Sequence, residues 1–174
     1  MKSSGEVRTM AFMSLMLAAA VMLTALESIL PPLPFAPPGI RLGLANVVTM
    51  YVLFFIGKKH ALMLIILKSV FVMLTRGVIA GILSITGGVL SVSVIILLSF
   101  ASKKTSYILL SAAGAMAFNF GQFAAASFIL STNILAIYWP LIIIFGVVLG
   151  SITGRVLEIV IPYLSKVAKP NEEH

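Results

Sequence analysis

Long uncharged stretches dominate the chain, and short segments with lysine, arginine, histidine or proline separate them. The stretches are continuous apolar runs without strand-like alternation, which favours helices. A helix rises about 1.5 Å per residue, so about 20 apolar residues cross the hydrocarbon core of a bilayer. The pattern predicts six membrane-spanning helices: residues 9–26, 42–57, two within 61–102, 107–130 and 134–157.

Two of the predicted boundaries need a separate argument. The uncharged residues from 77 to 102 are interrupted by three glycines between 81 and 88, which leaves the boundary between the third and fourth helices open. Residues 105–154 carry no charge and are too long for one crossing. The Ser-Thr-Asn sequence at 131–133 is the natural turn between the two helices that share this run.

Composition fixes the class of protein. Hydrophobic residues make up 60% of the chain, and the mean hydropathy is +1.16. A soluble core cannot absorb this much apolar surface, so we expect an all-α integral membrane protein. The net charge of +7 does not indicate a nucleic-acid partner, because the basic residues lie at the ends of the apolar runs and form no single patch. The chain has no cysteine, which excludes disulfides and thiol chemistry.

The basic residues also predict the orientation. Cytoplasmic loops of membrane proteins carry an excess of lysine and arginine. With both termini in the cytoplasm, only Arg41 and Arg76 lie at outer helix ends, and Lys68 lies within the third helix. The inner segments then hold the other nine basic residues: Lys2, Arg8, Lys58, Lys59, Lys103, Lys104, Arg155, Lys166 and Lys169.

We expect a single membrane domain at residues 9–165. A cytoplasmic leader at 1–8 precedes it, and a disordered cytoplasmic tail at 166–174 follows. The first apolar run is longer than the core of a signal peptide and lacks a good cleavage site, so it is kept as a helix. The extracellular loop at 31–40 contains five prolines, whose rings block helix formation, and it is a candidate for a stiff gate.

Several polar side chains fall at one level of the predicted topology. Ionisable groups within a bilayer cost several kcal/mol unless they are paired or face a cavity, so each marks a possible site. The simplest common cause is an outward-facing, water-accessible pocket, and the excess of bases over acids there favours a small anionic ligand. The candidate substrate-binding residues are Glu27, Arg41, Asn46, Arg76, Asn119 and Gln122.

Each candidate also has a structural interpretation. Glu27 and Arg41 also fit as anchors in the headgroup layer, and Asn119 and Gln122 as hydrogen-bonding contacts between helices. For Lys68 taken alone, we expect the aliphatic stem to lie in the apolar region and the ammonium group to reach the inner membrane surface. Arg76 stands beside glycines, where a helix can open.

Small residues form faces on two helices. Ala11, Ser14 and Ala18 lie on one side of the first helix, where contact with a partner subunit and packing within the bundle both remain open. On the sixth helix, Gly146 and Gly150, with a third glycine at 154, form a double GxxxG pattern. Packing within the bundle is the favoured interpretation for that stripe.

The proline-rich loop followed by PPGIRLGLANVVTMYVLFFIGKKHALMLIILKSV resembles the Gx transporter family, often labelled heptaprenyl diphosphate synthase component I. The stretch at 38–46 is its most specific part, and the six-helix layout is similar to that of S components of energy-coupling factor (ECF) transporters. The resemblance implies a multi-pass subunit of a bacterial or archaeal cytoplasmic membrane that captures a vitamin-like or precursor molecule. It also implies docking through the first helix to a coupling subunit driven by two ATPases. S components typically present Ala-xxx-Ala there, whereas this chain has Ser14-xxx-Ala18.

The synthase label predicts a chemistry that the residues do not support. Prenyl elongation needs aspartate-rich motifs that hold Mg²⁺ against a diphosphate, and the chain contains no aspartate. A Walker lysine loop, a nucleophile elbow and HExxH are also missing from the sequence, so we expect neither an enzyme nor a bound cofactor or metal.

The leading hypothesis is the substrate-binding subunit of an ECF-type transporter for a small anionic, partly apolar molecule such as a flavin, quinone or isoprenoid precursor. The rival hypothesis is a noncatalytic anchor or partner of a prenyl diphosphate synthase or redox assembly, and a third is a self-sufficient carrier. The expected partners are the small-molecule substrate and membrane lipid.

Overall fold

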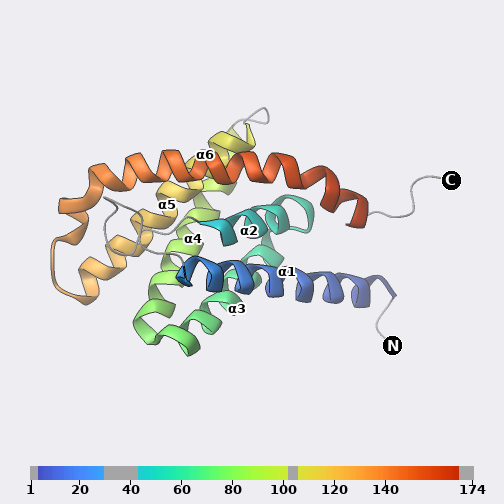
Figure 1. The fold of residues 1–174 in the computed structure, drawn as a ribbon, viewed down its shortest axis with the longest axis horizontal. Helices are drawn as coiled ribbons and strands as arrows, with labels where there is room; N and C mark the ends of the chain where they lie inside the picture. The colour runs from blue at the N-terminus through green and yellow to red at the C-terminus, as the bar shows by residue number, and fades with distance from the viewer. Residues whose placement is uncertain (1–3, 30–42, 102–105, 169–174) are drawn as a thin grey trace.

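The protein is described from a computed structural model, which places residues 4–29, 43–101 and 106–168. Six helices account for nearly all of these residues, and no strand occurs among them (Figure 1). The predicted all-α fold with six helices is therefore confirmed. The helices are α1 (Ser4–Ile29), α2 (Leu44–Phe55), α3 (Lys58–Arg76), α4 (Val78–Ala101), α5 (Tyr107–Ile129) and α6 (Ile134–Ala168).

Four of the six helices contain a segment long and apolar enough to cross a bilayer. These segments are Thr9–Ile29 in α1, Val78–Ala101 in α4, Tyr107–Ile129 in α5 and Ile137–Pro162 in α6. The second helix differs, because its 12 residues span only roughly 18 Å of a hydrocarbon core about 30 Å thick. Eight of those residues are buried, so α2 is an internal helix held by its neighbours.

Glycines with positive φ set the ends of the short central helices. Gly43 precedes α2 with φ 78°, and Gly57 separates α2 from α3 with φ 132°. Gly77, with φ 94°, ends α3 and settles the boundary that the sequence left open. Other residues adopt these backbone conformations only with strain, so the chain turns at these three places. The result is an α2 that is two residues shorter at each end than the predicted 42–57.

The first and last helices extend past the predicted limits of the membrane domain. Helix α1 begins at Ser4, whereas its segment long and apolar enough to cross a bilayer begins at Thr9, as predicted. Helix α6 continues to Ala168, although a disordered tail from 166 was expected. An ion pair from Arg155 Nη1 to Glu158 Oε2, 3.4 Å long and spaced three residues apart, supports the helix beyond its predicted end at 157. The proline-rich loop at 31–40 lies outside the described residues.

Helices α3, α4 and α5 pack as sequential antiparallel neighbours, and the glycines of α4 form the contacts. The sequence had suggested that these glycines interrupt the apolar run. They do not, because α4 runs unbroken past them. A Cβ atom on Gly88 would lie 2.7 Å from Ile65 Cγ2 of α3, and one on Gly87 would lie 2.8 Å from the Phe118 carbonyl oxygen of α5. Only a residue without a side chain allows helices to approach so closely.

The three glycines of α6 form a stripe that rests on α5. A Cβ atom on Gly146 would overlap Met116, and one on Gly150 would overlap the Cα of Ala112. One turn further along, a Cβ atom on Gly154 would lie 2.7 Å from the Cα of Ile108. The predicted packing role of the double GxxxG pattern is confirmed. A hydrogen bond of 2.8 Å between the Ser111 and Thr153 hydroxyls adds a polar link to the same interface.

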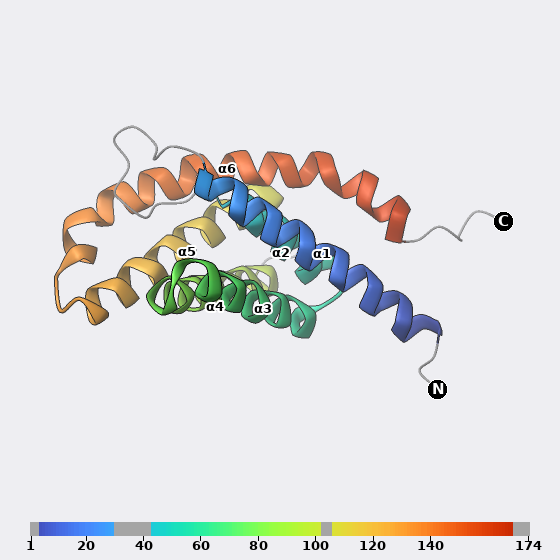
Figure 2. The same cartoon turned by 60° about the horizontal axis from the view of Figure 1, so that its bottom comes forward.

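Helix α1 lies against α2 and α3, while α2 also contacts α6. Figure 2 shows α1 crossing α2, with α3 and α4 side by side next to them. Met16 and Ala20 of α1 are buried here, together with Tyr51 and Val52 of α2. The core therefore centres on α2, and the C-terminal end of α1 meets the start of α2 and the end of α3.

The α5–α6 contact generates a first prediction. Gly150→Ala places a methyl group on the backbone of Ala112, which cannot move aside as a flexible side chain would. We expect a loss of about 1–3 kcal/mol in the free energy of unfolding, the usual range for overpacking. Thermal unfolding of the purified protein in detergent measures it. Val148→Ile also adds one carbon to α6, on an exposed face, and should leave the midpoint unchanged. Equal effects of the two substitutions would contradict the proposed contact.

Candidate functional site

The carboxylate of Glu27 links α1 to the beginning of α2. Its Oε1 accepts a hydrogen bond from the backbone N–H of Leu44, the first residue of α2. The first N–H groups of a helix lack partners within the helix, and the N-terminus carries partial positive charge. Gly43 has no side chain to cap this end. Glu27 supplies the missing acceptor from another helix.

Arg76 binds the same turn of α1. Its Nη2 donates a hydrogen bond of 3.4 Å to the carbonyl oxygen of Thr24, and the guanidinium is otherwise at an exposed position. Carbonyl groups near the end of a helix attract cations, because the C-terminus carries partial negative charge. Residues 24–27 of α1 therefore hold both the start of α2 and the end of α3.

Three of the predicted site residues thus meet at one end of the bundle. Asn46 lies in the first turn of α2, where it is half-buried. Its backbone N–H donates a hydrogen bond of 2.8 Å to the Gly43 carbonyl oxygen. It lies beside the contact made by Glu27, and Arg76 is tied to the same turn of α1. Arg41, the other predicted cation at this end, lies outside the described residues.

The two predicted amides lie elsewhere, on α5 inside the bundle. Asn119 and Gln122 are 2% and 5% exposed, respectively. The Gln122 side chain packs on Gly87 of α4, where a Cβ atom would lie 2.9 Å from Gln122 Cγ. The five predicted residues that the structure describes thus divide into a group at the helix ends and a group inside the bundle.

Sequence reasoning missed a buried cation in that inner group. Lys68 is only 3% exposed, and its Nζ lies 5.7 Å from the centre of the Phe118 ring of α5. The expectation that Lys68 extends to the inner surface is therefore wrong. A signal was present in the sequence, because the spacing of three and four residues places Lys68 on the buried face of α3. That face consists of Ala61, Leu64, Ile65, Lys68, Ser69 and Val72.

Two buried polar atoms of the described residues have no hydrogen-bond partner. They are the side-chain oxygen Oδ1 of Asn119 and the hydroxyl of Tyr51. Buried polar groups in folded proteins are nearly always satisfied, and exceptions often have a functional cause. Next to Asn119 is Phe118, the residue whose ring faces Lys68. The buried polar residues of α3 and α5 therefore include a cation, Lys68, and an unsatisfied acceptor, Asn119 Oδ1.

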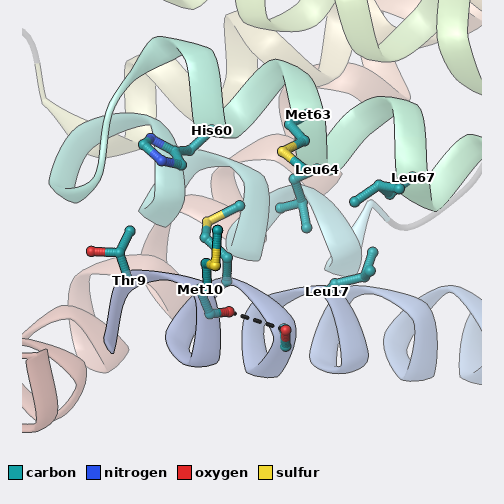
Figure 3. Close-up of a pocket in the computed structure, with 9 residues that line it drawn as sticks. Thr9, Met10, Leu17, His60, Met63, Leu64 and Leu67 are labelled. Atoms are coloured by element: carbon teal, nitrogen blue, oxygen red, sulfur yellow. Dashed lines mark hydrogen bonds between the residues drawn. The ribbon is translucent and has the colours of Figure 1, made fainter. Parts of the chain in front are cut away.

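An open cavity of about 400 Å³ lies between the first halves of α1 and α3 (Figure 3). Figure 3 shows Thr9, Met10 and Leu17 of α1 facing His60, Met63 and Leu67 of α3 across it. Ser14 also lines the cavity, and its hydroxyl donates to the Met10 carbonyl oxygen at 3.0 Å. Its lining is largely apolar and rich in methionine, a flexible side chain that adapts to different partners.

The predicted docking residues lie on the same part of α1. Ala11, Ser14 and Ala18 are all exposed, and Ser14 is the one that reaches the cavity. Three small exposed residues on one helix allow another helix to approach closely. The surface formed by Ala11, Ser14 and Ala18 is called the α1 small-residue face below.

The apolar helices and the buried polar groups define the class: a helical membrane protein with polar residues in its interior. The model of the family described as heptaprenyl diphosphate synthase component I matches residues 16–160, and the chain belongs to that family. The predicted family is thus confirmed. Comparison with curated proteins and with solved structures gave no match.

The Glu27 contact yields a second prediction. Glu27→Ala leaves the first N–H group of α2 without its acceptor, and caps of this kind contribute about 1 kcal/mol. We expect the free energy of unfolding to fall by about 1–2 kcal/mol, measured by thermal unfolding in detergent. Glu158→Ala is the control, since it breaks only an ion pair with the exposed Arg155, worth less than about 1 kcal/mol. A Glu27→Ala protein as stable as the control would contradict the capping role.

Proposed function

We propose that the protein is the substrate-binding membrane subunit of an ECF-type transporter, which takes up a small anionic, partly apolar molecule. The observation that carries this proposal is the burial of Asn119, Gln122 and Lys68 within an apolar helical bundle. Polar side chains in a membrane interior are expensive, and they commonly line substrate or ion pathways. The group at the helix ends, Glu27, Asn46 and Arg76, would lie where a solute enters.

A noncatalytic role is part of this proposal. The family name refers to one component of a synthase, yet the chain has no aspartate to hold the magnesium of a prenyl diphosphate. The proposed subunit therefore binds its substrate without changing it. Energy for uptake would come from a coupling subunit and two ATPases in the cytoplasmic membrane.

The α1 small-residue face is the proposed docking site for the coupling subunit. The adjoining cavity offers methionine side chains that can repack around an apolar helix of the partner. A docking surface on α1 does not involve the buried polar groups of α3 and α5, which would contact substrate. Binding of substrate and binding of the coupling subunit are then separable by mutation.

A third prediction tests substrate binding. Native mass spectrometry of the wild-type protein, purified in mild detergent, should detect a retained small molecule. The affinity for that molecule should fall at least about tenfold in Arg41→Ala and in Arg76→Ala, because each removes a charged hydrogen-bond donor. Lys59→Ala removes an exposed cation at the other end of α3 and should have no effect. Unchanged affinity in both arginine variants would remove these residues from the proposed site.

A fourth prediction tests docking. Ser14→Trp fills the α1 small-residue face and should abolish copurification with the coupling subunit and uptake driven by ATP. Retention of the small molecule should be unchanged, because the substitution is remote from α5. Leu15→Trp adds the same bulk at the neighbouring exposed position on α1 and should be tolerated. Normal copurification of the Ser14→Trp protein would rule out docking through this face.

A second function is favoured by the family name itself. A noncatalytic anchor or partner of a prenyl diphosphate synthase would place an apolar bundle beside an enzyme whose product is a lipid. Copurification of a soluble synthase, with no small molecule in native mass spectra, would support this function and exclude the transporter subunit.

A further inference from the structure

The cavity between α1 and α3 has a polar end and an apolar end. Figure 3 shows Thr9 and His60 facing each other at one end, and Leu17 and Leu67 at the other. The polar end therefore lies toward the beginnings of both helices. Between the two ends, methionine and leucine side chains form the lining, apart from the Ser14 hydroxyl, which donates to a backbone carbonyl oxygen of α1. A ligand that fits this cavity has a polar group at one end and a long apolar part.

The polar end of the cavity also carries positive charge. Lys59 is exposed and lies four residues, about one helical turn, before Met63, which lines the cavity. It therefore adjoins the cavity wall, next to the half-exposed His60. Lys58 faces α4 instead, with its Nζ 4.0 Å from the centre of the Phe100 ring. The charge at the polar end favours an anionic group on the ligand.

The size of the cavity favours a hydrocarbon chain over a helix. From Thr9 to Leu17, α1 rises roughly 12 Å, and a helix about 10 Å wide would fill roughly 900 Å³ over that length. The cavity holds only about 400 Å³. It reaches inward to the fully buried Leu64, where an extended acyl chain fits and a helix does not. A partner helix can contact the rim formed by the α1 small-residue face without filling the cavity.

We propose that this cavity binds an anionic phospholipid, with one acyl chain between α1 and α3 and the phosphate at Lys59 and His60. The predicted orientation places the beginning of α3 at the cytoplasmic side. Anionic lipids are attracted to basic residues on that side, and basic pockets between helices there bind their headgroups. A zwitterionic lipid would fill the apolar part equally well but gain less at the lysine. The lipid site does not depend on the proposed transport function.

The test compares dioleoyl phosphatidylglycerol with dioleoyl phosphatidylcholine, which carry the same acyl chains and differ in headgroup charge. Each lipid is titrated into the full-length protein after delipidation in mild detergent, and native mass spectrometry measures the bound fraction. We expect the wild-type protein to bind one phosphatidylglycerol at least about fivefold more tightly, the factor that one lysine near an anionic headgroup contributes.

Two matched lysine variants test the position of the headgroup. Lys59→Gln should lose most of the preference for phosphatidylglycerol and bind phosphatidylcholine as the wild-type protein does. Lys58→Gln removes the neighbouring exposed lysine, which faces Phe100, and should keep the preference. Equal losses in the two variants would indicate a general attraction of the surface for anions and would overturn the inference.

Two tryptophan variants test the acyl chain. Met63→Trp fills the cavity from α3 and should weaken both lipids to a similar extent. Ile66→Trp adds the same side chain outside the cavity, at a position 52% exposed compared with 56% for Met63, and should bind both lipids normally. Normal lipid binding by Met63→Trp would overturn the inference. Lys59→Gln changes an exposed residue, so the headgroup test stands even if Met63→Trp does not fold.

The wild-type protein provides the final criterion. If it binds neither lipid, or binds both equally, the inference is overturned and the cavity is left to a protein partner. The proposed function would be unaffected by that result, because the predicted substrate residues, including Asn119 and Gln122, lie outside the cavity.

Discussion

Close contact between helix backbones is the constraint on which the structure depends. In lipid, apolar side chains gain little by leaving their solvent, so helices associate where their surfaces fit closely. Glycines at 87 and 88 bring α4 onto its neighbours, and the glycine stripe of α6 rests directly on α5. These contacts join α4, α5 and α6 through their backbones. The remaining helices, including the internal α2, are positioned against it and against one another.

That close packing also surrounds the buried polar residues of the bundle. Lys68 and Asn119 lie where several helices meet at short distance, so neither side chain can move to water without separating them. A polar group held in this way is preorganised, because its orientation is set before any ligand arrives. The same arrangement leaves Asn119 Oδ1 without a partner. Buried polar groups that are paired, such as Ser69 with Ser84, link the helices, whereas Asn119 Oδ1 remains unsatisfied.

The two ends of the bundle have different chemistry. At the end where α1 stops, Glu27 and Arg76 connect three helices through contacts with helix termini, so charges expected to serve a ligand also serve the fold. At the other end, α1 and α3 diverge around an apolar cavity lined by methionines. Polar groups therefore stabilise one end of the bundle, and an adaptable apolar surface lies at the other. The proposed transporter subunit would use both properties.

The sequence by itself determined the membrane class, the six helices, the family and the packing role of the α6 glycines. These depend on local features: the length of an apolar run, a turn at 131–133, and small residues spaced four apart. Only the tertiary structure decided that α2 is an internal helix, that Glu27 caps it, and that Lys68 is buried beside Phe118. Hydropathy reports how apolar a segment is, but contacts between distant side chains depend on how each helix is rotated and which neighbour it faces. In this chain, glycine contacts between helices set those rotations.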